Sequence, residues 1–212
     1  MNHLFWAIFT LFLSSGCSSP TSKFKPEDDL KPVSFFELKN SFKYSNLKEF
    51  EIESIGWESL NGAFLELDSA AFYSVWQNGE KSFVEDGEDR NYFFSWQDRD
   101  TNFYEFTILS QEASENCIHI IYCIHDKAGK EIDKFIASSS CGDAGWYYEA
   151  SGKFINPSAY EMLSVEYQLN EDVPIEKGET FDGDSIVYHV TIDEKGKASK
   201  KEISKTHFTG KH

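Results

Sequence analysis

The chain has 212 residues, of which 36 are Asp or Glu and 20 are Lys or Arg, giving a formal net charge of -16. Nucleic-acid binding requires clustered cations that displace counterions from phosphates, so this excess of carboxylates excludes nucleic acid as the expected partner. The charged fraction of 26% excludes a protein with several transmembrane segments. The aromatic fraction of 16% favours strands, whose half-buried surfaces suit large rings.

The N-terminus carries the most specific pattern in the sequence. Residues 4–13 (LFWAIFTLFL) form an apolar run that is too short to span a bilayer and has the length of a signal-peptide core. Small residues follow directly, and then Cys17. This arrangement resembles the lipobox of bacterial lipoproteins, in which the bond before a cysteine is cut and the cysteine is lipidated. An ordinary cleavable signal and an uncleaved anchor are the alternatives.

The resemblance implies a signal peptide over residues 1–16, a lipid on Cys17 and an extracytoplasmic location at the outer membrane or cell surface. Residues 17–32 are rich in Ser, Pro, Lys and acids and lack a periodic apolar pattern, which is typical of a flexible tether. Residues 33–212 are then expected to form a single, mostly β domain of ordinary size.

Two short helices are expected near the N-terminal side of this domain. Apolar spacing predicts one within 33–44 and another over 70–77, which Ser69 would cap and Asn78-Gly79 would end. Alternation and aromatic or β-branched content predict strands at 49–55, 62–67, 81–85, 91–97, 103–109, 117–125, 131–139, 146–150, 160–169, 184–192 and 198–205.

Two turns share one sequence pattern. Residues 126–130 and 193–197 both read D-x-x-G-K between predicted strands, which is typical of a three-residue hairpin loop with Gly in the left-handed conformation. Residues 98–102 (DRDTN) are a third candidate hairpin turn. Short consecutive strands with tight turns predict an antiparallel meander that closes as a sandwich or a partly open barrel.

Three cysteines follow Cys17. Cys117 and Cys123 lie on one predicted strand, about 20 Å apart when extended, so they cannot bond to each other. If Asp126 faces Lys130 across the turn, Cys117 lies opposite Ser139, with Cys141 two residues beyond on the same face. A Cys117–Cys141 disulfide is therefore favoured, and three separate buried thiols are the alternative.

One face of the same strand carries metal-type ligands. Cys117, His119, Cys123 and His125 share its odd positions, and Cys141 and Asp143 approach from the neighbouring strand. The spacing matches no established zinc pattern, so no metal or other cofactor is expected. The alternative is that His119 and His125 are polar residues on a half-exposed face. Acidic turns at 86–89 and 182–184 are explained by the turn chemistry of Gly and Asp.

No nucleophile elbow, metalloprotease helix or phosphate-binding loop is present, which favours a non-enzymatic role. The leading hypothesis is a membrane-anchored, non-catalytic binding or structural module of the cell envelope with a protein or glycan ligand. An inhibitor or immunity-type lipoprotein acting on a basic enzyme is a second hypothesis. A glycan hydrolase with paired carboxylates is a third, because that chemistry requires only two placed acids.

Overall fold

The computed structural model describes residues 35–52, 60, 62–77, 79, 81–84, 87–99, 101–169 and 180–211. Residues Lys31–His212 form one compact unit, to which all the described residues belong. The expected signal peptide over 1–16, the lipidation site Cys17 and the tether over 17–32 lie outside the described residues.

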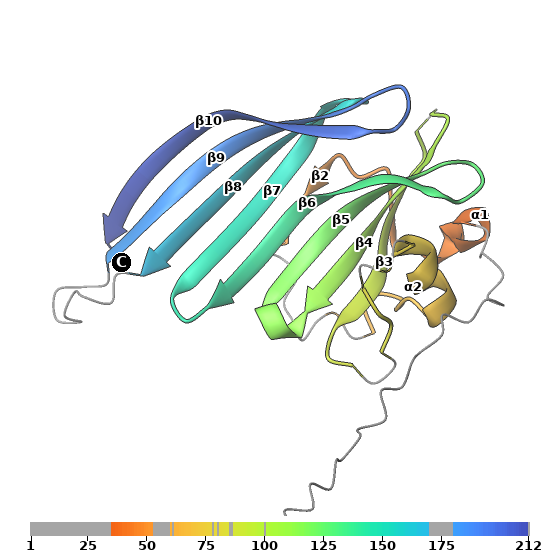
Figure 1. The fold of residues 1–212 in the computed structure, drawn as a ribbon, viewed down its shortest axis with the longest axis horizontal. Helices are drawn as coiled ribbons and strands as arrows, with labels where there is room; N and C mark the ends of the chain where they lie inside the picture. Colours follow the sequence, from red (N-terminus) through yellow and green to blue (C-terminus); the bar gives the residue numbers. More distant parts are fainter. Residues whose placement is uncertain are drawn as a thin grey trace, which may run out of the picture. The chain divides into compact units, whose positions relative to one another are not determined.

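Among the described residues, ten strands form one sheet and the helices are short (Figure 1). The elements are α1 Phe35–Leu38, the 3-10 helix Lys39–Ser41, β1 Tyr44–Ser45, β2 Glu49–Phe50, α2 Ser69–Val75, β3 Arg90–Gln97, β4 Tyr104–Glu112, the 3-10 helix Ala113–Glu115, β5 Cys117–His125, β6 Glu131–Asp143, β7 Trp146–Asn156, β8 Ala159–Leu169, β9 Thr180–Ile192 and β10 Ala198–Lys211. From β3 to β10 each strand pairs antiparallel with the next, so the predicted mostly β meander is confirmed. The sheet is not closed into a barrel.

Both D-x-x-G-K turns have the predicted geometry. The Asp126 and Lys130 backbones pair at 2.8 Å, and Asp193 and Lys197 pair at 2.9 Å. In each turn the Asp side chain accepts hydrogen bonds from two backbone amides of the loop. Gly129 and Gly196 take φ values of 86° and 80°, a conformation that Gly adopts without steric cost.

The N-terminal third departs most from the sequence prediction. The helix expected within 33–44 is reduced to α1 and one 3-10 turn. In the predicted strand 62–67, Glu66 forms an isolated bridge to Tyr92, and residues 81–84 form no strand. Phe83 instead packs against Phe72 with ring centroids 5.5 Å apart, because this segment covers a helix rather than pairing with a strand.

The α2 helix is capped one residue earlier than predicted. Asp68 is the N-cap, and its carboxylate accepts a hydrogen bond from the Ala71 amide at 2.8 Å. A carboxylate at this position also interacts favourably with the helix dipole, which explains why it replaces the predicted Ser69.

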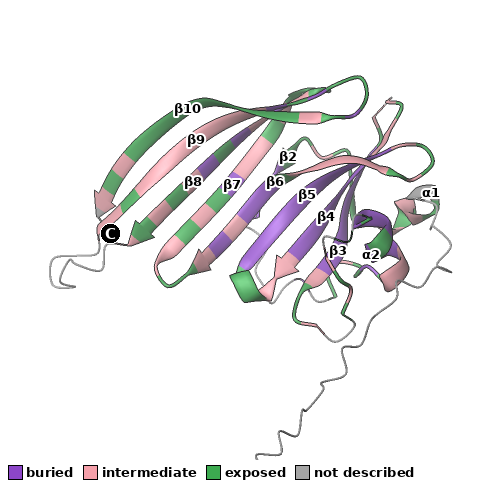
Figure 2. Ribbon diagram, in the orientation of Figure 1, coloured by how far each residue is buried: buried purple, intermediate pink, exposed green. Residues whose placement is uncertain are grey.

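Two hydrophobic cores lie on opposite faces of the central strands. On one face α2 packs against β3, β4 and β5 through Phe72, Phe93, Phe106 and Ile121. On the other face, β2, β7, β8 and β9 share a core with β3, β4 and β5, which includes the contact of Phe50 with Tyr122 at 6.1 Å. Figure 2 shows the resulting gradient, from a buried β5 to a mostly exposed β10.

Candidate functional site

The strand that carries the predicted metal ligands, β5, is buried on both faces. All nine of its residues are buried; His119 retains 9% exposure and His125 none. The prediction that these histidines lie on a half-exposed face is therefore wrong. The odd face of β5 belongs to a core: Ile121 and Cys123 pack in the cluster under α2, and the Phe106 ring of that cluster lies 5.0 Å from the His125 ring. The alternation within the strand could not reveal this packing.

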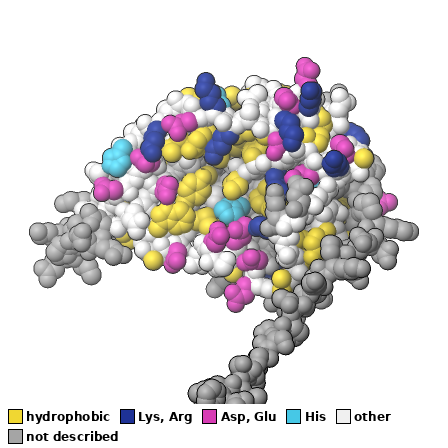
Figure 3. Space-filling model, in the orientation of Figure 1, with side chains coloured by type: hydrophobic (Ala, Val, Ile, Leu, Met, Phe, Trp, Pro, Cys, Tyr) yellow, Lys and Arg dark blue, Asp and Glu magenta, His cyan; other side chains and the backbone are white. Residues whose placement is uncertain are grey.

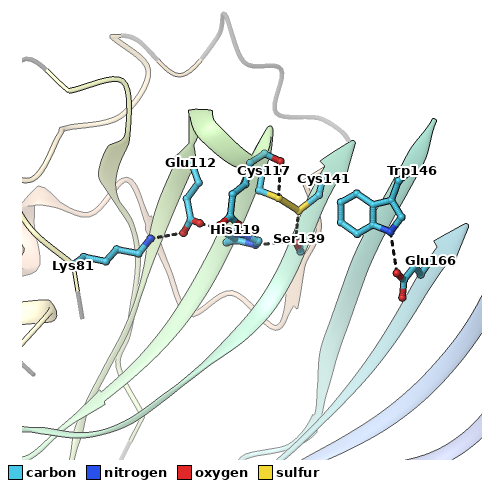
Figure 4. The surroundings of a disulfide bond; sticks show 9 residues. Lys81, Glu112, Cys117, His119, Ser139, Cys141, Trp146 and Glu166 are labelled. Atoms are coloured by element: carbon cyan, nitrogen blue, oxygen red, sulfur yellow. Dashed lines mark hydrogen bonds and ion pairs between the residues drawn. A yellow bond between two sulfur atoms is a disulfide. The ribbon is translucent and has the colours of Figure 1, made fainter. Parts of the chain in front are cut away.

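A disulfide joins Cys117 and Cys141 at one end of β5 (Figure 4). The bonded pair is the one that the turn predicted, but the strand register that brings the two cysteines together differs from the predicted register. Cys117 lies directly opposite Cys141, with a Cα–Cα distance of 4.2 Å, and His119 rather than Cys117 faces Ser139. Two irregularities in the β5–β6 pairing, between Ile120 and Ile121 and near His125, shift the register by two residues from the one that the turn alone dictates.

A chain of polar contacts extends from the disulfide across the sheet. Ser139 Oγ lies 2.8 Å from His119 Nδ1 and 3.5 Å from Cys141 Sγ. His119 Nε2 lies 4.0 Å from a Glu112 carboxylate oxygen, and the other carboxylate oxygen of Glu112 accepts a hydrogen bond from Lys81 Nζ. Figure 4 shows these side chains in one line across neighbouring strands.

Burial lowers the pKa of His119, and the nearby Glu112 carboxylate offsets only part of this effect. A neutral His119 can both accept and donate hydrogen bonds, which suits its position between Ser139 and Glu112. The proximity of Glu112 to Lys81 leaves a compact pair of opposite charges at the edge of the site.

Metal binding at this end of β5 competes with the disulfide. The ligand atoms of Cys117, His119 and Cys141 lie within 4.8 Å of one another, and this is the one such group found in the part of the chain that the structure describes. A bonded disulfide sulfur is not a thiolate ligand, so only His119 remains to bind an ion.

The other two candidate ligands lie toward the far end of the strand. Cys123 is 1% exposed within the α2 core, and burial raises the pKa of its thiol well above the usual range. His125 Nδ1 lies 3.2 Å from the Gly129 carbonyl, and burial lowers the pKa of His125 to about 4. The structure therefore does not bring the four predicted ligands together.

Ser139 and His119 are the residue types that form a nucleophile and its general base, but a substrate cannot reach them. Ser139 is 2% exposed, and its oxygen is enclosed by His119 and the disulfide. A serine nucleophile must reach a substrate carbonyl, which this burial prevents. The arrangement is that of a satisfied buried polar cluster.

A buried charged group that the sequence did not reveal is Glu105, on β4. It is 2% exposed, accepts a hydrogen bond from Tyr122 Oη at 2.5 Å, and lies 3.6 Å from Arg99 Nη1. The Arg99 guanidinium in turn lies over the Phe154 ring at 3.6 Å and donates to the Pro157 carbonyl. These contacts tie the β3–β4 loop to the β7–β8 hairpin. The sequence offered one signal for this buried pair. Arg99 is one of two arginines in the chain, and it lies next to a predicted strand.

No known protein family matches the chain, and comparison with curated proteins and with solved structures gives no match either. None of the helices among the described residues has the length and hydrophobicity required to cross a bilayer. Any inference about the function therefore rests on the residues of the chain itself.

The disulfide is expected to contribute measurably to stability. Cys117 and Cys141 are 24 residues apart, and a loop of this size restricts the unfolded chain by about 3 kcal/mol. The double variant Cys117→Ala/Cys141→Ala should lose roughly that amount in urea unfolding. Dithiothreitol should lower the stability of the wild type toward that of the variant and leave the variant unchanged. Equal stability of variant and oxidised wild type would contradict the bond.

The buried His125 predicts a specific loss of stability in acid. Its pKa is about 4 when folded, against 6.5 for an exposed histidine, so only the unfolded chain binds a proton between these values. Stability should fall as pH falls from 6.5 to 4, at about 1.4 kcal/mol per pH unit for a fully titrating group. The variant His125→Gln has no titrating group at this position. The difference between its free energy of unfolding and that of the wild type should therefore become smaller as the pH falls from 6.5 to 4.

Gln77→Ala is the matched control for this experiment. The Gln77 amide donates to the same Gly129 carbonyl at 2.7 Å, but it does not titrate. Its free-energy difference from wild type should stay constant from pH 7 to pH 4. If the free-energy difference from wild type becomes smaller to the same extent in both variants, groups other than His125 cause the acid sensitivity.

Proposed function

We propose that the chain is an exported protein, anchored to the cell envelope by a lipid on Cys17, whose β domain binds another protein without catalysing a reaction. The apolar run at 4–13, the small residues before Cys17 and the tether-like composition of 17–32 support the anchor. The Cys117–Cys141 disulfide supports an oxidising compartment, since such bonds persist outside the cytoplasm.

The observation that carries the binding role is the outer part of the sheet. Residues 165–169, 180–189 and 199–210 of β8, β9 and β10 contain no buried side chain. In Figure 1 the parts of β8, β9 and β10 that carry these residues lie at the end of the sheet away from α2. Apart from Tyr188, which packs against the core that contains Phe50 and Tyr122, this part of the sheet adds little apolar burial to offset its conformational entropy, which suggests a surface with another purpose.

One face of this region carries a ladder of aromatic rings across four strands. Tyr147 stacks on Tyr167 at 4.9 Å, Tyr167 contacts Phe181 at 5.5 Å, and Phe181 contacts Phe208 at 6.1 Å. Gly183 allows the ladder to cross β9: a Cβ there would lie 2.8 Å from the Phe208 ring. The same face continues into Val165, Leu163 and Val187, and Leu163 is 44% exposed.

The ring geometry favours a protein ligand over a glycan. Sugars stack on exposed ring faces, whereas Tyr147 and Tyr167 lie nearly parallel, with an interplanar angle of 16°, and cover each other's faces. Stacking covers one face of each of these two rings, and Leu163, Val165 and Val187 place aliphatic side chains beside them, which is the composition of the apolar centre of a protein interface.

Lipidation is tested by the intact mass of protein recovered from envelopes of the producing cells. The wild type should begin at Cys17, carry acyl groups and partition into detergent. Cys17→Ala should lose the acyl mass, because it lacks the thiol that carries the lipid. Cys123→Ala is the control cysteine change and should remain acylated. An unmodified wild-type mass would contradict the proposed anchor.

Binding is tested by photo-crosslinking in intact cells. A benzophenone side chain in place of Tyr147, which is 37% exposed, should give a discrete adduct that protease treatment destroys and that Tyr167→Ser weakens. The same group in place of Tyr73 on α2, which is 42% exposed, is the control and should give none. Equal labelling from both positions, or a protease-resistant glycan adduct, would contradict a protein ligand at the aromatic ladder.

A further inference from the structure

Three side chains at the disulfide end of β5 become a set of metal ligands when the bond is open. Cys117 and His119 lie two residues apart on β5, so their side chains point to the same face of the sheet, and Cys141 lies directly opposite Cys117 on β6. The ligand atoms, two sulfurs and one imidazole nitrogen, lie within 4.8 Å of one another. With the disulfide closed, these residues are a buried polar cluster. Reduction turns the same cluster into two thiols beside an imidazole.

The spacing of the ligand atoms fits a tetrahedral zinc site. Zinc binds thiolate sulfur at about 2.3 Å and imidazole nitrogen at about 2.0 to 2.1 Å, so ligand atoms of one site are about 3.5 to 3.8 Å apart. The Cα atoms of Cys117 and Cys141 are 4.2 Å apart, and opposed residues on paired strands have Cβ atoms about 4.5 to 5.5 Å apart. Rotation about the Cα–Cβ bonds of the two cysteines therefore lets both sulfurs reach one ion while the strand pairing is kept.

The surroundings of His119 match those of a metal-bound histidine (Figure 4). Ser139 Oγ lies 2.8 Å from His119 Nδ1 and 3.5 Å from Cys141 Sγ, so Nδ1 is the ring nitrogen on the side of the sulfurs. Nε2 lies 4.0 Å from a Glu112 carboxylate oxygen, and a movement of about 1 Å makes this contact a hydrogen bond. In most metal sites the histidine donates its second N–H to such a group, which fixes the ring and raises its basicity. Glu112 is itself held by the Lys81 ammonium.

The ligand types select the ion. Thiolate and imidazole groups bind zinc, whereas calcium and magnesium prefer oxygen ligands. Three protein ligands leave the fourth tetrahedral position to water. The Ser139 hydroxyl, displaced from Nδ1 by the ion, is placed to donate a hydrogen bond to the Cys141 thiolate.

The site lies just below the surface. Cys117, His119 and Cys141 retain 4%, 9% and 7% exposure. Acidic side chains gather beside a histidine near the middle of the face shown in Figure 3. Carboxylates at a surface raise the local concentration of cations, which favours entry of an ion from this side.

We propose that the dithiol form of the chain binds a zinc ion through Cys117 Sγ, Cys141 Sγ and His119 Nδ1, and that the ion and the disulfide exclude each other. Glu112 acts as a positioning residue for His119. The inference depends neither on the aromatic ladder nor on the lipid anchor.

The two states are connected by thiol–disulfide exchange. A dithiol reductant supplies two electrons and two protons: its own sulfurs form a disulfide while the Cys117–Cys141 bond breaks to give two thiols. Zinc then displaces the two thiol protons, which pass to the solvent. In the opposite direction, a disulfide oxidant takes two electrons from the thiolates and two protons from the solvent. The Cys117–Cys141 bond forms again and the ion is released.

The first test is a Co²⁺ titration of the full chain after reduction with a phosphine, which contributes no thiol ligand. Thiolate-to-cobalt charge-transfer absorption should appear, reach saturation at one ion per chain and disappear when Zn²⁺ is added. The oxidised chain should show no such absorption. A reduced chain without the absorption, or an oxidised chain that binds Zn²⁺ as tightly as the reduced one, would overturn the proposal.

Substitutions at the two ends of β5 locate the ligands. Cys141→Ser and His119→Gln should weaken Co²⁺ binding roughly 100-fold or more, which is the upper end of what loss of an outer-shell partner costs. Cys123→Ala and His125→Gln are the matched controls on the same strand and should leave the affinity unchanged. Loss of the charge-transfer absorption in either control would place the ligands elsewhere and refute the assignment.

Two further variants test the remaining parts of the proposal. Glu112→Gln should weaken binding about 10-fold and leave the charge-transfer spectrum unchanged, because the ligands stay the same. A changed spectrum would make Glu112 a ligand and contradict its positioning role. Cys17→Ala should bind Co²⁺ as the wild type does, whatever the outcome for the lipid anchor.

A measurement on the wild-type sequence covers the case in which a ligand variant does not fold. Zn²⁺ should protect Cys117 and Cys141 of the reduced chain from alkylation, as mapped by peptide mass. Oxidised glutathione should then release the ion to a chromophoric chelator as the disulfide re-forms. If Zn²⁺ leaves the alkylation of both cysteines unchanged, or if the ion stays bound after the disulfide has formed, the proposal is wrong.

Discussion

Burial of β5 on both faces is the constraint from which the polar organisation of the domain follows. A strand between two cores has no solvent to satisfy its polar side chains, so each must find a partner within the protein. Tyr122 therefore donates to Glu105, and the buried Glu105 carboxylate requires the charge of Arg99. On the opposite face His119 is held by Ser139, and the histidine pKa falls. Groups that resemble catalytic or metal-binding residues in the sequence are here the polar components of a core.

The sequence predicted the strands and turns of the C-terminal two thirds because their signals are local. A D-x-x-G-K loop specifies its own hairpin through Asp side-chain hydrogen bonds and a left-handed Gly, whatever surrounds it. The segment around 81–84 had the composition of a strand, but the position of Phe83 is decided by contact with Phe72 on α2. Such tertiary contacts have no local signature, and for the same reason the burial of His119 and His125 could not be predicted.

The disulfide shows how a correct pairing can depend on features that a sequence does not display. The Gly129 turn alone places Cys117 opposite Ser139, and the bond then requires a distortion of the strand ends. In the structure, irregular pairing within β5 and β6 shifts the register, and Cys117 faces Cys141 directly. The same shift brings Ser139 opposite His119, so one displacement produces both the disulfide and the polar contacts around it. Register within a strand pair is cooperative, which is why site residues are harder to predict than elements.

The outer part of the sheet departs from what folding stability alone would favour. Tyr167 and Phe181 of β8 and β9 belong to neither hydrophobic core, whereas Tyr160, Met162 and Val190 on the same strands do. Aromatic rings that stay outside a core gain less from burial than rings inside one. The position of the outer rings is therefore better explained by the binding role proposed for this surface than by packing within the domain.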